Sequence, residues 1–268
     1  MELLRFARRL AVDAGDIARD RGRLGSAKRK ADASPVTEID HAIQAGIVDA
    51  IVERFPDHAI IAEEPLPEGL VEVAPRPTEA RYCWVIDPLD GTRNLVAGFP
   101  FFATSVALLD RGNPIVGVVV EHNLRAVYQA ARGNGATCND QPIRVSDASA
   151  TDDLLLGVPS SKDPLTERIV RRWLATPGVN LRNVGSAAMH LALVAAGALQ
   201  GAFCKQCKLW DVAAGVLLVT EAGGIATDPT GKSLIPFDLA IDPDAAADIP
   251  SLATSATLHE HLLAAIRA

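Results

Sequence analysis

Apolar residues recur at helical spacing in two stretches near the N-terminus. Between residues 2 and 21 they fall three or four positions apart, with arginine and aspartate between them, which predicts an amphipathic helix. Residues 22–34 are polar and contain glycine, so a loop or an irregular hairpin is expected there. A second helix is predicted to start near residues 35–37, capped by Thr37, because Ile39 opens a stripe of isoleucines at every fourth position.

The middle of the chain changes to short runs of apolar and β-branched residues separated by turn residues. Residues 59–62 and 84–86 each predict a buried strand, and the proline-rich stretch between them, residues 65–80, predicts a connecting loop. Further strands are predicted over residues 101–109, 114–121 and 126–131, with turns at residues 111–113, 133–136 and 139–142. This section is therefore expected to form an antiparallel sheet.

From about residue 147 the pattern becomes an alternation of strands and helices, which is typical of an α/β arrangement. Strands are predicted over residues 154–158, 180–184, 201–204 and 250–255, and helices over residues 164–175, 186–197, 211–222 and 259–267. The sequence thus predicts two domains. The first, residues 1–146, is an α+β domain with the antiparallel sheet, and the second, residues 147–268, is an α/β domain.

Composition narrows the class of protein. With 49% apolar residues among 268, the chain can bury a large core, yet no apolar run approaches the length of a membrane span. The net charge of −7 argues against a nucleic-acid polymer as a partner. The N-terminus lacks the apolar core of a secretory signal and four cysteines do not make a disulfide framework, so the cytoplasm is the expected compartment.

Two carboxylates stand three residues apart where the strand at residues 84–86 ends. Pro88 cannot donate to a sheet ladder, so the strand is predicted to stop at Asp87. Buried carboxylates so close together are costly unless a cation lies between them. A hard divalent cation would satisfy Asp87, Asp90 and the carbonyl of Leu89, because it prefers oxygen ligands. A surface turn with both carboxylates in solvent is the alternative that this motif alone leaves open.

Three further acids also lie at the ends of predicted elements. Glu63 follows the strand at residues 59–62, Asp40 lies in the first turn of the second helix, and Asp211 lies at or near the N-cap of a later helix. The two helical acids have a simpler interpretation, because an acid at a helix start complements the helix dipole or caps the backbone. Strand ends and helix starts are, however, where α/β proteins carry their functional groups.

These acids lie in motifs that resemble those of the inositol monophosphatase-like family of magnesium-dependent phosphatases. The specific matches are residues 62–64 (AEE), residues 84–95 (WVIDPLDGTRNL), and residues 209–215 (LWDVAAG) continuing to residues 220–224 (TEAGG). Residues 34–40 (SPVTEID) and 185–188 (GSAA) also match, so that the resemblance covers nearly the whole chain. It implies a five-layer α-β-α-β-α sandwich of the type shared with fructose-1,6-bisphosphatase, and it implies a homodimer.

The resemblance also implies roles for individual residues. The ligands of two or three Mg²⁺ ions, for which Mn²⁺ could substitute, would be Glu63, Asp87, Asp90, Asp211 and the carbonyl of Leu89. Substrate contacts are implied for Asp90, Gly91, Thr92, Gly185, Ser186 and Asp211, with the N–H groups of Gly91 and Thr92 on the phosphate. Asp40 and Thr92 resemble the pair that activates the attacking water, and Glu63 is the alternative base.

The implied reaction is hydrolysis of a small phosphomonoester by a metal-activated water, without a covalent intermediate. Two departures from the family pattern bear on the substrate. Ala62 stands where family members often have glycine, and Cys204 stands where inositol phosphatases carry a glutamate against the sugar ring. The substrate therefore stays open among an inositol phosphate, histidinol phosphate, a sugar bisphosphate and a nucleotide 3′-phosphate. A metal-binding family member without catalysis is the non-enzyme alternative.

Cys204 and Cys207 form a Cys-x-x-Cys pair. A zinc site would need further ligands, and the remaining cysteines, Cys83 and Cys138, are isolated from one another. We interpret the pair as two thiols beside the substrate loop, with a redox or metal role as the alternative.

Overall fold

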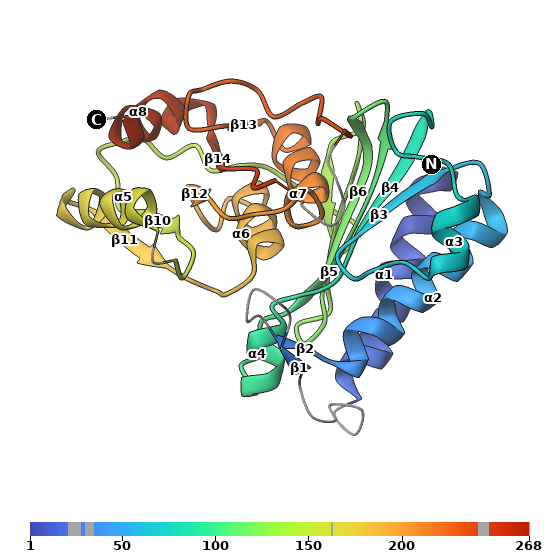
Figure 1. Cartoon of the computed structure of the whole chain (residues 1–268). Coiled ribbons are helices and arrows are strands. Elements are labelled where there is room, and N and C mark those ends of the chain that lie inside the picture. The colour runs from blue at the N-terminus through green and yellow to red at the C-terminus, as the bar shows by residue number, and fades with distance from the viewer. Residues whose placement is uncertain (21–27, 30–34, 162, 241–246, 268) are drawn as a thin grey trace.

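The computed structural model describes residues 1–20, 28–29, 35–161, 163–240 and 247–267, in which helices and sheets alternate in five layers (Figure 1). Helices α1 (Glu2–Arg19) and α2 (Glu38–Arg54) cover the outer face of the larger sheet. Helices α6 (Ala187–Ala195) and α7 (Leu209–Glu221) lie between the two sheets, and α5 (Pro164–Ala175) and α8 (Ala256–Arg267) cover the smaller sheet. The predicted α-β-α-β-α sandwich is confirmed.

The larger sheet has seven strands in the order β3-β4-β5-β6-β7-β8-β9. These strands are β3 (Ala59–Ala62), β4 (Tyr82–Asp90), β5 (Ala103–Asp110), β6 (Asn113–Glu121), β7 (Ala126–Ala131), β8 (Ala136–Cys138) and β9 (Gln141–Ile143). Only β3 and β4 are parallel, so the antiparallel section is confirmed. The short strands β8 and β9 were predicted only as turn sequence. Asn139 and Asp140 connect them at positive φ, as a two-residue hairpin favours.

The smaller sheet has five strands in the order β11-β10-β12-β14-β13. The central strand β10 (Leu154–Gly157) is parallel to β11 (Val179–Arg182) and to β12 (Gly201–Cys204), whereas β14 (Ser251–Ser255) is antiparallel to β12 and to β13 (Gly224–Thr227). The alternation of strands and helices predicted for this half is present. A third, small pair joins β1 (Lys28–Arg29) to β2 (Pro35–Val36), within the segment expected to be a loop or an irregular hairpin.

Two local predictions were wrong for identifiable reasons. The proline-rich connection contains a helix, α3 (Glu68–Val73), because Pro67 precedes its first turn and so removes none of its hydrogen bonds. The strand predicted to stop at Asp87 continues as β4 to Asp90. Its register shifts, because Asp87 pairs with Ser105 and Asp90 with Ala103. The two residues between the acids therefore bulge from the ladder, where a proline costs no ladder bond.

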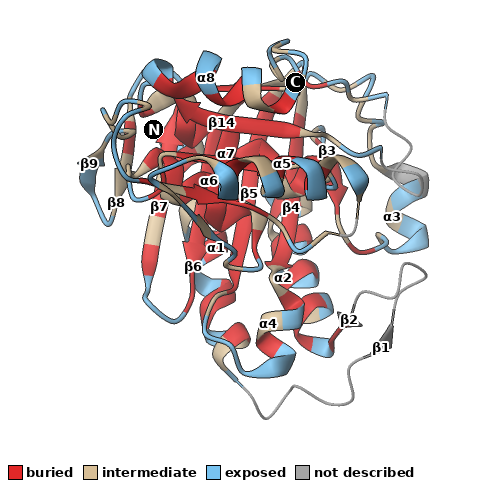
Figure 2. Cartoon of the chain, turned by 90° about the vertical axis from the view of Figure 1, so that its left-hand side faces the viewer, coloured by how far each residue is buried: buried red, intermediate tan, exposed pale blue. Residues whose placement is uncertain are grey.

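Buried residues fill the spaces between the layers (Figure 2). One apolar cluster joins a face of the seven-stranded sheet to α6 and α7 and reaches Ala253 on β14. A second lies under α1 and α2, and a third lies between the five-stranded sheet and helices α5 and α8. The first cluster contains side chains from both sides of residue 146, so the two halves share a core. A domain boundary at that residue stays a prediction. Within the described ranges, no helix combines the length and apolarity needed to cross a bilayer.

Candidate active site

Strand ends and one helix start bring the four predicted metal-ligating acids together. Because β3 and β4 are parallel neighbours, Glu63 after β3 and Asp87 in β4 lie at the same edge of the sheet. The N–H of Glu63 donates to the carbonyl of Ile86 at 3.1 Å, which continues the pairing one residue beyond β3. Helix α7, which carries Asp211 in its first turn, packs against β4 and β5. The acids thus come from three elements that touch.

The electrostatics of these acids show how closely they lie. Burial and the negative charges of Glu63, Asp90 and Asp211 raise the pKa of Asp87 well above its usual range. Burial, followed by the charge of Asp90, raises the pKa of Asp211 in the same direction. Burial also raises the pKa of Asp90 to about 6. Acids that repel one another so strongly need positive charge, and a hard divalent cation with oxygen ligands fits this set of donors.

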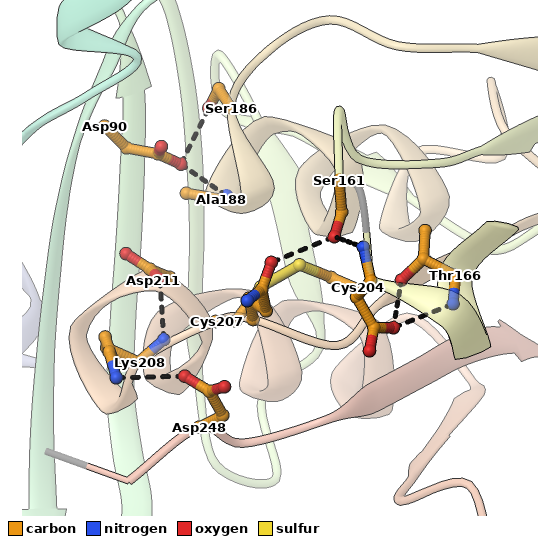
Figure 3. The surroundings of a disulfide bond; sticks show 12 residues. Asp90, Ser161, Thr166, Ser186, Ala188, Cys204, Cys207, Lys208, Asp211 and Asp248 are labelled. Atoms are coloured by element: carbon orange, nitrogen blue, oxygen red, sulfur yellow. Dashed lines mark hydrogen bonds and ion pairs between the residues drawn. A yellow bond between two sulfur atoms is a disulfide. The ribbon is translucent and has the colours of Figure 1, made fainter. Parts of the chain in front are cut away.

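One oxygen of each aspartate is fixed by a hydrogen bond from the protein, and Figure 3 shows these bonds for Asp90 and Asp211. Asp87 Oδ1 accepts from the N–H of Leu89 at 2.9 Å, and Asp211 Oδ2 accepts from the N–H of Lys208 at 2.6 Å. Asp90 Oδ2 accepts from Ser186 Oγ at 2.8 Å and from the N–H of Ala188 at 2.6 Å. In the part of the chain that the structure describes, no three acid, histidine or cysteine side chains are already arranged around a metal position.

Asp40 and Thr92 lie beside the carbonyl of Leu89, which is one of the predicted metal ligands. Thr92 opens α4 (Thr92–Ala97), and its Oγ lies 2.9 Å from Asp40 Oδ1 and 3.0 Å from the carbonyl oxygen of Leu89. Asp40 is fully buried as the third residue of α2, where its Oδ2 accepts from the N–H and the hydroxyl of Thr37 at 2.8 and 2.5 Å. The predicted Thr37 cap is confirmed. Gly91 precedes Thr92 at a φ of 97°, which favours glycine.

The loop before α6 approaches the acids from the other half of the chain. Ser186 is the N-cap of α6, since its Oγ accepts from the N–H of Met189 at 3.1 Å while it donates to Asp90. Gly185 has a φ of 72°, and a Cβ there would lie 2.7 Å from Asn94 Oδ1. Asn94 Nδ2 donates to the carbonyl of Val184 at 2.8 Å, so it ties this loop to α4. The structure therefore brings Gly185 and Ser186 to the acids.

Asp211 lies near the N-cap of its helix, as predicted, although the helix begins two residues earlier than the predicted start at residue 211. Helix α7 begins at Leu209 with Lys208 as its N-cap, so Asp211 is the third helical residue rather than the cap. From this position its carboxylate reaches back to the N–H of Lys208, which is one half of a capping box. The capping interpretation therefore holds, because one oxygen caps the helix. The carboxylate still faces the other acids, so its predicted role as a metal ligand stays open.

Cys204 and Cys207 are joined by a disulfide, which corrects the interpretation of the pair as two thiols (Figure 3). Cys204 ends β12 and Cys207 lies directly before the N-cap of α7, which places their Cα atoms 6.2 Å apart, within the range that a disulfide spans. The bridge lies in the connection that leads to Asp211. The two isolated cysteines, Cys83 and Cys138, are free.

Sequence reasoning missed the side chains that hold the site residues in place. Gln44 of α2 makes a pair of hydrogen bonds with the backbone of Glu64: its Nε2 donates to the carbonyl at 2.7 Å and its Oε1 accepts from the N–H at 2.9 Å. Gln44 therefore fixes the residue that follows Glu63. A signal was present, because a glutamine one turn after Asp40 stands next to the isoleucine stripe. Asn94 lay inside the long motif, but its partner is ninety residues away.

Comparisons with known proteins agree with this geometry. The family model for the inositol monophosphatase family matches residues 1–268. "Inositol monophosphatase 1" of Bos taurus is 35% identical over 247 residues, which cover 89% of this chain and 86% of that protein. "Nus factor SuhB" of Escherichia coli K12 is 40% identical over 209 residues, which cover 76% of each chain. Among solved structures, the IMPase of Thermotoga maritima has a TM-score of 0.85 at 30% identity, covering 100% of this chain and 97% of that one.

Proposed function

The chain belongs to the inositol monophosphatase family, which supports a phosphatase activity, and on that premise we propose that it hydrolyses a small phosphomonoester with Mg²⁺. The observation that best supports this proposal is the meeting of Asp87, Asp90 and Asp211 in one buried cluster, where the pKa of each is raised. Glu63 completes the proposed ligands, together with the carbonyl of Leu89. When bound, two or three Mg²⁺ or Mn²⁺ ions supply positive charge for the phosphate and acidify the attacking water.

Asp40 and Thr92 prepare the attacking water in this proposal. The Thr92 hydroxyl donates toward Asp40 Oδ1, so its oxygen can accept a hydrogen from water and pass its own to Asp40. Asp40 already accepts from the N–H and hydroxyl of Thr37, which keep its carboxylate oriented. Glu63, at the same edge of the sheet, is the alternative base. No covalent intermediate is required.

The substrate's phosphate would bind at the start of α4, and its organic part would bind toward the other half of the chain. The N–H groups of Gly91 and Thr92 precede the hydrogen-bonded turns of α4, so they are available to phosphate oxygens. Gly185 and Ser186 then lie on the side of the organic group, with Asp90 and Asp211 contacting both substrate and metal. Cys204 ends β12 on that side, bonded to Cys207, where an inositol phosphatase would carry a glutamate.

A phosphate-release assay tests the proposal. The panel is an inositol monophosphate, histidinol phosphate, a sugar bisphosphate and a nucleotide 3′-phosphate, each with Mg²⁺ and with a chelator. We expect Mg²⁺-dependent release from at least one member, and loss of it in Asp90→Asn. The matched control is Asp13→Asn, which changes an exposed aspartate on α1. Metal binding without release from any substrate would favour the non-catalytic alternative, which the name "Nus factor" of a 40% identical relative keeps in view.

We further propose a homodimer that acts on a free phosphorylated metabolite, without a nucleic-acid polymer or a membrane as partner. Light scattering on the purified protein measures the first point, since a dimer has twice the chain's mass of 28.3 kDa. A monomeric mass would contradict it.

A further inference from the structure

Between Asp87 and Asp90 of β4, one peptide group makes hydrogen bonds through both its N–H and its carbonyl. Its N–H belongs to Leu89 and donates to Asp87 Oδ1 at 2.9 Å. Its carbonyl belongs to Pro88 and accepts from Thr104 Oγ at 2.8 Å. Thr104 lies on the neighbouring strand β5 and is fully buried. The orientation of Asp87, a proposed metal ligand, therefore depends on a peptide whose carbonyl accepts a hydrogen bond from Thr104.

A buried histidine holds Thr104 in turn. His122 Nε2 lies 2.8 Å from Thr104 Oγ, and His122 is fully buried just after β6. Because a carbonyl can only accept, the one hydroxyl hydrogen of Thr104 must point to Pro88. The hydrogen between Thr104 and His122 must then come from the histidine. The geometry therefore requires a proton on Nε2.

The other ring nitrogen confirms that this histidine is neutral. In the described residues His122 Nδ1 is buried without a hydrogen-bond partner, so a proton there would be left unsatisfied. Helix α1 closes this side of the ring, since a Cβ on Gly15 would lie 3.0 Å from Nδ1. Burial, with the positive charge of Arg19 nearby, lowers the pKa of His122 to about 3. Nδ1 is thus a bare acceptor, and Nε2–H is the fixed donor.

We propose that Thr104 and His122 are positioning residues for metal binding, which act through the peptide between Pro88 and Leu89 on the carboxylate of Asp87. The chain of hydrogen bonds runs from His122 Nε2 to Thr104 Oγ, to the Pro88 carbonyl, and across the peptide to Asp87 Oδ1. This inference rests on the proposed function, because it assumes that Asp87 binds a metal.

The register shift makes such a support necessary. Where β4 bulges from the ladder between Asp87 and Asp90, the peptide after Pro88 lacks the paired hydrogen bonds of a regular strand. Without Thr104 only the hydrogen bond from Leu89 N–H to Asp87 would hold this peptide, and a rotation of the peptide would take that N–H away from Asp87. Partners of this kind behind a metal ligand typically contribute about 10–100-fold to metal affinity.

Direct metal binding by four variants tests the proposal. Thr104→Val keeps the shape of the side chain but removes its hydroxyl, Thr104→Ser restores the hydroxyl, and His122→Phe removes the donor to Thr104. The matched control is Thr254→Val on β14. Thr254 is also fully buried, and its Oγ lies 2.9 Å from His259 Nδ1 and donates to the carbonyl of Ser255 at 2.8 Å. It is the same kind of pair in the five-stranded sheet.

Mn²⁺ binding is measured by titration calorimetry, and each variant's melting temperature is recorded. We expect Thr104→Val to bind Mn²⁺ about 10–100-fold more weakly, Thr104→Ser to bind nearly as wild type does, and His122→Phe to show a smaller loss. Thr254→Val should melt earlier and bind Mn²⁺ normally. In the phosphatase assay, Thr104→Val should need more Mg²⁺ for half-maximal rate while its kcat at saturating Mg²⁺ stays near wild type.

Several outcomes would overturn the proposal. Equal Mn²⁺ affinity in Thr104→Val and wild type would reduce Thr104 to a packing residue, and equal losses in Thr104→Val and Thr254→Val would do the same. Nitrogen NMR of wild-type His122 needs no variant to fold, and a proton on Nδ1 would contradict the hydrogen-bond chain. If wild type binds Mn²⁺ but releases no phosphate, only the proposed enzyme activity fails. If wild type binds no metal, both proposals fail.

Discussion

The seven-stranded and the five-stranded sheets contribute to the site in different ways. The seven-stranded sheet and its helices provide side-chain acids, at strand ends and at a bulge. Apart from Asp211, the other half provides donors at the starts of α6 and α7, such as the N–H of Ala188 and the hydroxyl of Ser186. Negative charge is thus concentrated on one side, and the other side partly neutralises it with backbone dipoles.

This difference separates the residues proposed to carry out the chemistry from those proposed to select the substrate. The acids and the Thr92–Asp40 pair lie within residues 40–92, apart from Asp211, and are held by many short hydrogen bonds. The loop at Gly185 and the disulfide-bridged connection at Cys204 lie on the side proposed for the organic group. We therefore expect substitutions in the first set to change rate, and substitutions in the second to change which substrate is used.

The largest effect on activity should come from changing Asp90 or Asp211, where the two halves of the chain meet at the site. Asp90→Asn and Asp211→Asn each remove a proposed metal ligand, so kcat should fall by roughly 10²–10³-fold or more while the fold survives. Phosphate release and a melting curve measure the two properties, with Asp13→Asn as the control. Activity within tenfold of wild type in either variant would show that one side alone suffices.

The next largest effect is a change with pH in the free energy of unfolding of the metal-free protein, caused by proton binding to Asp90. The folded protein keeps the Asp90 proton up to a pH of about 6, whereas the unfolded chain releases it near 3.8. The folded state thus binds more protons between these values, so this group's contribution lowers the free energy of unfolding as pH rises through the window. Asp87 and Asp211 shift in the same direction.

The measurement compares Asp90→Asn with wild type in chelator, because the buried histidines shift in the opposite direction and would obscure wild type alone. The pKa of His190 is lowered to about 4 by burial, for example. The melting temperature of Asp90→Asn minus that of wild type should rise between pH 4 and 7. If this difference in melting temperature did not change with pH, the result would argue against crowded acids.

Mg²⁺ at a hundredfold excess over its Kd should stabilise wild type at pH 7 by about 2.7 kcal/mol.

A smaller effect on stability and KM is expected at the loop before α6, where Gly185 lies against Asn94 of α4. Gly185→Ala forces an unfavourable backbone conformation and a contact with Asn94, so it should destabilise the protein by about 1–3 kcal/mol and raise KM more than it lowers kcat. The control is Gly46→Ala on α2, where a Cβ meets nothing within 4 Å. That change should stabilise the protein by about 0.5–1 kcal/mol, because alanine favours helix. Equal behaviour of the two variants would remove the proposed role of this loop.

The smallest effect should come from the disulfide. The ring closed by Cys204 and Cys207 is short, so replacing both with alanine should cost no more than about 2 kcal/mol of stability and leave kcat nearly unchanged. Dithiothreitol added to wild type should shift the melting temperature by a similar amount. A large loss of activity on reduction would instead show that this connection controls Asp211.

Most elements could be predicted from the sequence, because they depend on local patterns, and the structure brings the predicted acids together; their role as metal ligands stays a prediction. Runs of apolar and β-branched residues predicted the strands β5 to β7, and Asp87 and Asp90 stood in a long, specific motif. The register shift after Asp87 was not predictable in this way, because Pro88 alone indicates a strand end as readily as a bulge. Only pairing with β5 distinguishes the two outcomes.

The supporting side chains were missed for a different reason. Gln44, Asn94 and Thr104 hold the site through partners that are distant in sequence. A local signal, such as the position of Gln44 beside the isoleucine stripe, does not identify those partners. Thr104 and His122 stand in runs that read simply as strand. Their pairing emerges only when β5 and β6 are placed side by side, which is information that the fold supplies.

The hydrogen bonds between Gln44 and Glu64 have a consequence for how the protein behaves in a crowded solution. Strand β3 is at the edge of its sheet, where free backbone groups can recruit a strand from another molecule and begin aggregation. Just beyond it, one amide side chain occupies both the N–H and the carbonyl of Glu64. The four residues of β3 are themselves buried, and helix α2 in this way also covers the backbone just beyond them. The same contact that orders the site therefore discourages self-association at this edge.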